Sequence, residues 1–197
     1  MLREQDQVET LDGAEIIVFT TFDEWVTWLD SHHELKAGVW CKIAKKGSGK
    51  TSITITQALD GALCYGWIDS IRRSLDKEYY LQRYSARRPK GAWSKVNVDK
   101  AEALIASGRM RDPGFAAIAA AKADGRWDAA YLSQRIATVP DDLAAELAAN
   151  PTAKTAFESL DRTHQYALLL RLMKAKTPTT RATQLTQILT TLTTATP

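Results

Sequence analysis

The residue types best suited to chemistry gather between Trp67 and Lys95. This segment carries eight Lys and Arg residues against three acidic ones, a net charge of +5 in a chain whose net charge is only +3. Five Trp and Tyr residues are interleaved with these cations. Guanidinium groups offer paired donors to phosphate or carboxylate, and aromatic faces stack on bases, sugars or guanidinium groups. The segment is therefore the predicted binding region.

A helix start is predicted directly after this segment. Asn97 has the residue type of an N-cap, and the free N–H groups of a helix start favour an anion. We therefore predict that this helix start forms one anion pocket with Arg87 and Arg88. The full set of candidate ligand-binding residues is Trp67, Asp69, Arg72, Arg73, Arg83, Arg87, Arg88, Trp93, Ser94 and Asn97.

Two other interpretations of the same residues stay open. In an enzyme, Asp69 would act as acid or base while the arginines hold an anionic substrate, with Tyr65 and Ser94 as helpers. Neighbouring arginines lower the pKa of a carboxyl group, which suits a base poorly, and the three histidines lie outside the segment. In a purely structural role, Asp69 would pair with Arg73 and the arginine stems would cover the aromatic rings.

A second motif, AKKGSGKT at residues 44–51, fits the loose form of a phosphate-binding loop. Such a loop needs a helix immediately after it, so that the helix N-terminus faces the phosphates. The sequence SITIT that follows is β-branched and alternating, which disfavours a helix there. We interpret this segment as a basic loop.

No metal or cofactor is predicted. Cys41 and Cys64 stand in apolar contexts and are interpreted as reduced, buried thiols. No zinc-ligand spacing joins them to a histidine. The first residues, MLREQDQVET, contain no apolar core of a signal peptide, and no apolar run reaches the ~18 residues of a membrane span. We expect a cytoplasmic protein with no membrane insertion.

The N-terminal half is predicted to mix strands and helices. Strands are expected at residues 15–19 and 39–44, each being apolar and β-branched or alternating. Capping-box patterns begin helices at Thr21 with Glu24 and at Thr54 with Gln57. The segment 67–84 is predicted to be a β-hairpin, because SLDK interrupts two β-favouring runs.

The C-terminal half is predicted to be helical throughout. Gly108 ends the helix that begins near Asn97, and Asp112-Pro113 begins another that runs to about Ala123. Further helices are expected to begin at Asp141 and at Asn150-Pro151. Two apolar stripes at helical spacing follow, and they consist of Tyr166, Leu169, Leu170 and Met173, then Leu185, Ile188, Leu189 and Leu192.

These elements predict an α+β fold: a small mixed sheet with helices in residues 1–95, then an all-helical region in residues 96–197. Hydrophobic residues make up 45% of the chain and charged residues 25%. That balance excludes a disordered chain, a collagen and a disulfide-stapled miniprotein.

Six sequence blocks resemble the YdeI/OmpD-associated family, which is also labelled bacteriocin-protection. They are ALCYGWIDSIRR (62–73), YLQRYSARRPKGAWSKVN (80–97), LIASGRM (104–110), AKADGRWDAAY (121–131), VPDDLAAELAANPTAKTAFESL (139–160) and AKTPTTR (175–181). The resemblance covers Phe19 to Leu192. It implies a bacterial protein with an α+β part and a C-terminal helical module at about 139–192, and no established reaction or cofactor. Residues 182–184 depart from the family, which usually carries a second arginine pair there.

We therefore predict that the protein binds a small anionic or phosphate-bearing ligand through its Arg/Trp-rich segment. Nucleic acid is disfavoured as a partner because the basic patch is compact and the net charge is modest. The alternatives are an enzyme that acts on a small anionic metabolite, and a protein-interaction module in the C-terminal helices. The last would show an exposed stripe at Tyr166, Leu169, Leu170 and Met173. The sequence makes no prediction of the oligomeric state.

Overall fold

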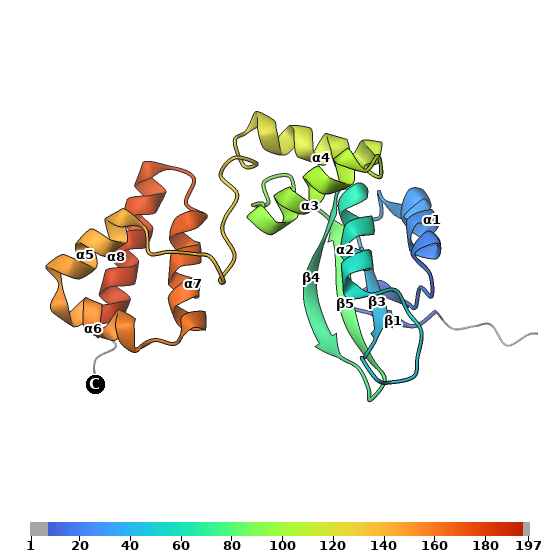
Figure 1. Cartoon of the computed structure of the whole chain (residues 1–197), viewed down its shortest axis with the longest axis horizontal. Coiled ribbons are helices and arrows are strands. Elements are labelled where there is room, and N and C mark those ends of the chain that lie inside the picture. The colour runs from blue at the N-terminus through green and yellow to red at the C-terminus, as the bar shows by residue number, and fades with distance from the viewer. Residues whose placement is uncertain (1–7, 195–197) are drawn as a thin grey trace, which may run out of the picture. The chain divides into compact units, whose positions relative to one another are not determined.

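The computed structural model of the chain describes residues 8–194. The chain forms two compact units (Figure 1). Of the described residues, the first unit contains 8–91 together with 99–124, and the second contains 92–98 together with 125–194. Each unit has its own core and is described by itself below.

The first unit is built on a five-stranded mixed sheet, as predicted. Its strands are β1 (Thr10–Leu11), β2 (Ala14–Ile17), β3 (Val39–Ala44), β4 (Trp67–Ser74) and β5 (Tyr79–Ala86), in the spatial order β1-β2-β3-β5-β4. Only β2 and β3 run parallel, because the helix α1 (Phe22–His32) crosses between them. The predicted hairpin is confirmed as the antiparallel pair β4 and β5.

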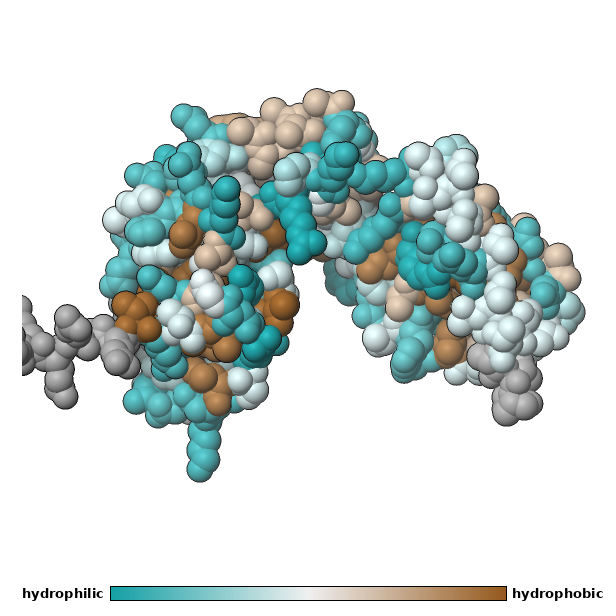
Figure 2. All heavy atoms as spheres, turned by 180° about the vertical axis from the view of Figure 1, so that it is seen from behind, coloured by the Kyte–Doolittle hydropathy of each residue, from teal (hydrophilic) through white to brown (hydrophobic). Residues whose placement is uncertain are grey.

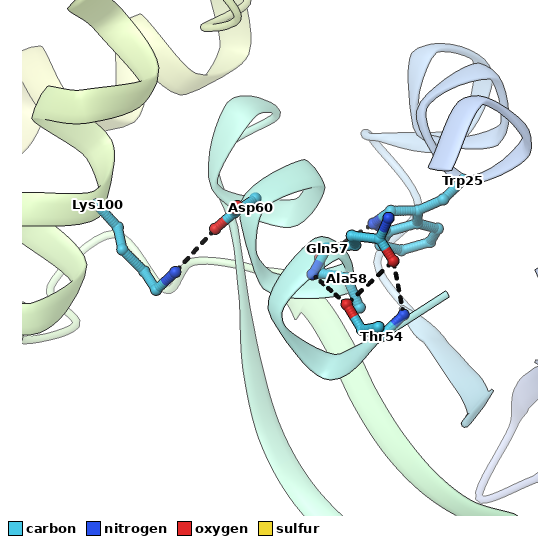
Figure 3. Close-up of polar contacts among 6 residues, drawn as sticks. All are labelled: Trp25, Thr54, Gln57, Ala58, Asp60 and Lys100. Carbon is cyan, nitrogen blue, oxygen red and sulfur yellow. Dashed lines mark hydrogen bonds and ion pairs between the residues drawn. The ribbon is translucent and has the colours of Figure 1, made fainter. Parts of the chain in front are cut away.

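Two helices of the first unit begin where their capping boxes predict. Thr21 caps α1 and Thr54 caps α2 (Ile55–Cys64), each within a complete capping box. Figure 3 shows the second box, in which the Thr54 backbone N–H donates to Gln57 Oε1 at 2.9 Å. Two more helices follow: α3 (Lys95–Ala106), which belongs to this unit from Asp99 onward, and α4 (Asp112–Ala123). The Lys100 ammonium group lies 3.0 Å from the Asp60 carboxylate and so ties α3 to α2.

Trp25 fills the space between α1, α2 and the sheet. Its side chain is fully buried, and its ring lies 5.7 Å from that of Tyr84 on β5. Its indole N–H donates to the Ala58 carbonyl at 3.0 Å (Figure 3). Gly61 makes this packing possible, since a Cβ at that position would stand 2.6 Å from the indole. The face of the sheet that carries Tyr84 is therefore the helix-covered face.

The opposite face of the sheet carries a small second cluster. Trp40, Leu81 and Ala14 are buried there, with Leu11 and Ile16 packed against them. Figure 2 views the molecule from behind, and brown apolar residues are interspersed there with teal and white ones over the first unit. Within residues 8–194 no helix covers this face, which we call the open face, and side chains of the sheet itself cover its buried residues.

The second unit is helical, also as predicted. It contains α5 (Asp141–Ala149), α6 (Pro151–Ser159), α7 (Arg162–Met173) and α8 (Pro178–Thr194). Asn150 caps α6 by accepting from the Ala153 N–H at 3.1 Å. Four of the buried residues in its core come from the two last helices, namely Leu169, Leu172, Ile188 and Leu192.

The stripe on α7 packs inward. Leu169 is buried, Met173 and Leu170 are half-buried, and Tyr166 donates its hydroxyl to the Leu132 carbonyl at 2.9 Å. The exposed stripe that a protein-interaction module would need on this helix is therefore not formed. Within residues 8–194, no helix is both long enough and apolar enough to cross a membrane.

A bidentate ion pair fastens α8 to α5. The Arg181 guanidinium donates to both carboxylate oxygens of Asp142, at 2.6 and 2.9 Å, and also to the Leu172 carbonyl. The hydrogen bonds from Arg181 lower the pKa of Asp142 below its ordinary value, although partial burial acts the other way. Both side chains are about one-third exposed, so solvent screens the pair.

We predict a pH-dependent loss of stability from this pair. Because the folded pKa of Asp142 lies below the unfolded one, the pair stabilises the fold above about pH 4, and the stabilisation is lost as the pH falls through the folded pKa. Asp142→Asn should lower the free energy of unfolding at pH 7 by about 1 kcal/mol. The deficit should shrink on acidification. Urea denaturation at several pH values measures both effects, with Glu146→Gln on the same helix as the control. An unchanged deficit at pH 3 would contradict this account.

Gly114→Ala provides a second test of the fold. In an ordinary helix, replacing Gly with Ala stabilises by about 1 kcal/mol. Here the added Cβ would overlap Met110 Sδ and the Cys64 carbonyl, so α4 must move away from the end of α2. We expect a net loss of about 2 kcal/mol in the free energy of unfolding. A gain in stability in urea denaturation would show that these two helix ends are not in close contact.

Candidate functional site

A cleft of about 510 Å³ lies where three helix ends of the first unit meet. Asp30 and His33 come from the end of α1, and Tyr65 follows α2 directly. The third wall is residues 110–113, at the start of α4. The volume falls within the roughly 300–1,000 Å³ range of small-molecule sites.

Backbone contacts hold two of the walls together, the end of α2 and the start of α4. The Arg111 N–H donates to the Cys64 carbonyl at 3.2 Å, which joins the start of α4 to the end of α2. Gly66 turns the chain away from α2 with a φ of 71°, and a Cβ there would stand 2.8 Å from the Pro113 carbonyl oxygen. A glycine is therefore needed at this position for both reasons.

Trp67 fixes the other wall. Its side chain is fully buried, and its indole N–H donates to the His33 carbonyl at 2.6 Å. His33 Nδ1 in turn lies 3.0 Å from the Asp30 carbonyl oxygen. Trp67 was predicted to bind ligand directly. The structure gives it a supporting position behind the cleft.

Tyr65 supplies the central polar group of the cleft. The residue is only 4% exposed, and its hydroxyl donates to Asp30 Oδ1 at 3.1 Å. Burial raises the pKa of Tyr65, and the hydrogen bond to Asp30 and the Asp30 charge raise it further, while Arg111 acts in the opposite direction. The phenol is thus held protonated and acts as a fixed hydrogen-bond donor.

The cleft contains charges of both signs. Asp30 and Asp112 contribute carboxylates, and Arg111 contributes a guanidinium group. Arg111 also stands at the N-cap position of α4, which has no side-chain cap hydrogen bond. This arrangement can bind a carboxylate or phosphate near Arg111 and an ammonium group near the carboxylates.

The arginines of the hairpin lie on two faces of the sheet. Residues that pair across neighbouring strands share a face, and faces alternate along a strand. Arg72 pairs with Gln82, two residues from Tyr84, so it lies on the helix-covered face. Arg73 and Arg83 pair with Leu81 and Trp40 on the open face. These three guanidinium groups therefore do not converge in one hollow.

Each of these arginines covers an aromatic ring. The Arg73 and Arg83 guanidinium carbons lie 5.4 and 5.5 Å from the centre of the Trp40 ring. Arg72 lies 4.6 Å from the Tyr80 ring. The ion pair expected between Asp69 and Arg73 is replaced by one between Arg73 and Asp12, at 3.0 Å. These contacts are the ones expected if the arginines have a structural role and cover the aromatic rings.

A β-bulge in β4 explains why Asp69 and Arg72 share a face. The pairing with β5 shifts between these two residues, which are three apart in the sequence. Gln82, only 3% exposed, fastens the bulge: its Nε2 donates to the Ile71 carbonyl at 3.3 Å, and its Oε1 accepts from Arg72 Nε at 3.2 Å. Asp69 lies opposite Tyr84 and is half-buried.

The remaining candidate residues lie after β5. Arg87 is half-buried and donates its backbone N–H to the Gly66 carbonyl at 3.0 Å, whereas Arg88 is exposed. Both belong to the first unit, and Trp93, Ser94 and Asn97 belong to the second. Trp93 is buried against Trp127, with ring centres 4.9 Å apart.

The helix predicted to start at Asn97 begins two residues earlier, at Lys95. Ser94 acts as the cap: its hydroxyl accepts from the Asn97 N–H at 3.2 Å, and its carbonyl accepts from the Asn97 and Val98 N–H groups. The Lys95 N–H is bound by the Tyr131 carbonyl at 2.8 Å. The expectation that Asn97 caps the helix is therefore wrong, because Ser94 holds the cap position, and an anion pocket at this helix start stays a prediction.

Two models of known protein families match parts of the chain. A family model described as Domain of unknown function (DUF8412) matches residues 17–117, about half of the chain. A second, described as Bacteriocin-protection, YdeI or OmpD-Associated, matches residues 137–194. The chain therefore belongs to the DUF8412 family, and its C-terminal part matches the YdeI/OmpD-associated model. No curated protein and no solved structure matches it.

The second match confirms the expected family resemblance, but over a shorter stretch of the chain than expected. The YdeI/OmpD-associated description attaches to the four C-terminal helices, although the resemblance was expected from Phe19 onward. The sheet and the cleft fall within the DUF8412 match. Neither description names a reaction or a ligand, so the function is argued from the site.

The sequence did not point to most of the cleft. Tyr65 was named as a helper, but Asp30, His33 and Arg111 were not candidates. The available signal was a helix start at Asp112-Pro113 without a capping Ser or Thr, close to an arginine. The hydrogen bond from Tyr65 to Asp30 spans 35 residues, and no local spacing predicts such a contact.

Gln82→Leu tests the clamp on the bulge. The apolar side chain would leave the Ile71 carbonyl and Arg72 Nε without their partner, and we expect a loss of about 1–2 kcal/mol in the free energy of unfolding. Amide hydrogen exchange should also accelerate around Ile71 and Arg72. Ser85→Ala on the same strand is the matched control. Equal exchange rates in wild type and Gln82→Leu would refute the clamp.

Proposed function

We propose that the first unit binds a small zwitterionic molecule, one that carries an anionic and a cationic group, in the Tyr65 cleft. The observation that carries the proposal is the Tyr65 hydroxyl inside a cleft of about 510 Å³. Tyr65 is buried, its hydroxyl donates a hydrogen bond to Asp30, and the nearby Arg111 lowers its pKa. Few other places in a small protein gather convergent polar groups at a cavity of this size.

The charges in the cleft favour this class of ligand over a simple anion. Asp30 and Asp112 would repel an isolated phosphate or carboxylate, whereas Arg111 alone would attract it. A molecule with both groups can place its anion on Arg111 and its ammonium group on the carboxylates. Because the single Tyr65 proton is donated to Asp30, the hydroxyl oxygen would accept a hydrogen bond from the ammonium group of the ligand. Free amino acids are the simplest members of this class.

The hairpin hypotheses stay predictions. A small anion could still bind near Arg87 and Arg88, and Asp69 could still act with Arg72 on the helix-covered face. The face assignments support neither a pocket that includes Arg73 nor one that includes Arg83. Cytoplasmic location and bacterial origin are likewise expectations from the sequence.

A thermal-shift and calorimetric screen tests the proposal. The probes are free amino acids, matched carboxylic acids without the amine, matched amines without the carboxylate, and inorganic phosphate. We expect the zwitterions to give the largest rise in Tm. Arg111→Gln and Tyr65→Phe should each weaken binding roughly tenfold or more, because each removes a hydrogen bond from the bound molecule.

Lys46→Gln, which removes an exposed cation in the 45–54 loop, is the charge-matched control and should bind like wild type. Circular dichroism verifies that each variant is folded. Equal affinity in wild type and Arg111→Gln would overturn the proposal. Stabilisation by phosphate alone, lost in Arg87→Gln with Arg88→Gln, would favour the hairpin hypothesis instead.

A further inference from the structure

The outer edge of β4 is a long strand edge with no strand beside it. β4 is the last strand of the sheet and has eight residues, and among residues 8–194 no strand other than β5 pairs with it. The opposite edge, β1, has two residues. Natural sheets usually shorten or cover their edges, because unpaired backbone N–H and C=O groups recruit other chains.

The tip of the hairpin exposes apolar as well as charged side chains. Every residue from Ser70 to Lys77 is exposed. Ile71 is 52% exposed and Leu75 is 37% exposed, although both are large aliphatic residues. A strand placed along this edge would cover part of that apolar surface.

The bulge gives this edge a defined shape. Because Gln82 holds the Ile71 carbonyl and the Arg72 side chain, the strand is fixed on both sides of its irregularity. Arg72 lies on the helix-covered face and Arg73 on the open face. A strand along the edge would therefore meet one cation on each face.

Both cations are available to a partner. The contacts that Arg72 makes within the described part of the chain are to the Gln82 amide and the Tyr80 ring, which are neutral. Arg73 is paired with Asp12, but both side chains are nearly half exposed, and such a pair contributes little. Carboxylates at neighbouring positions of an added strand would match these two arginines.

We propose that the β4 edge binds an extended acidic segment of a partner protein by strand addition. The partner's backbone pairs with β4, its acidic side chains lie beside Arg72 and Arg73, and its apolar side chains cover Ile71. A second copy of this chain fits less well, because two β4 edges would bring like charges opposite each other. This inference does not depend on the ligand of the cleft.

Fluorescence anisotropy with a labelled peptide of the repeat Glu-Glu-Val-Val, which places carboxylates on both faces of an extended strand, tests the proposal on the full chain. N-methylation of alternate residues removes the N–H groups along one edge of an extended peptide and leaves those along the other. We expect one of the two methylated peptides to lose roughly tenfold or more in affinity and the other to bind like the parent. A purely electrostatic contact would treat the two methylated peptides alike, and that result would overturn the proposal.

Charge-reversal variants locate the site. Arg72→Glu with Arg73→Glu should abolish binding of the acidic peptide and favour a lysine–valine peptide, while Lys46→Glu should change neither. Tyr65→Phe should also retain full peptide binding, which separates this test from that of the cleft. Tighter binding to a single-stranded oligonucleotide than to the peptide, or peptide-independent dimerisation lost in the double variant, would overturn the assignment to an acidic partner.

Discussion

The packing of Trp25 beneath Gly61 is the constraint on which the candidate site depends. The indole fills the gap between α1 and α2, and the missing side chain at Gly61 lets the two helices come close enough for its N–H to reach the Ala58 carbonyl. Asp30 follows Trp25 on α1, and Tyr65 follows Gly61 at the end of α2. The distance between the Tyr65 hydroxyl and the Asp30 carboxylate is therefore set by a contact more than a helical turn away from both.

The fold was largely predictable because its signals are local. The two capping boxes, the hairpin, the Asn150 cap and the stripes of the last two helices each lie within a few residues, and each is realised. Boundaries were less certain where two cap residues compete. Ser94 caps the helix that Asn97 was expected to cap. Hydrogen bonds that join its two neighbours, Trp93 and Lys95, to Tyr131 hold Ser94 in that position.

The site was less predictable because its contacts are not local. A run of arginines and aromatics indicates a binding surface only if the side chains point the same way, and in a strand neighbours point to opposite faces. The bulge changes that alternation at one place, so the face of Arg72 could not be read from its position relative to Asp69. The cleft, by contrast, joins residues from three separate helix ends, each unremarkable by itself.

The charge of the hairpin serves two purposes at once. Arg73 and Arg83 spread their guanidinium groups over Trp40, so the indole is fully buried although no helix covers that face. Cations that shield an aromatic core also keep the edge of a sheet from pairing with copies of itself. Arg73 therefore belongs both to the cover of Trp40 and to the charged edge of β4.

The two free cysteines give the first unit an internal reporter of its own motions. Both are buried, and burial raises the pKa of each thiol, so neither ionises readily while the unit stays closed. Cys64 ends α2 beside the cleft, whereas Cys41 lies in the middle of the sheet. Alkylation of Cys64 therefore follows local separation of the helix ends, and alkylation of Cys41 follows disruption of the strands. The alkylation rates of the two thiols would thus report these two openings separately, without any added label.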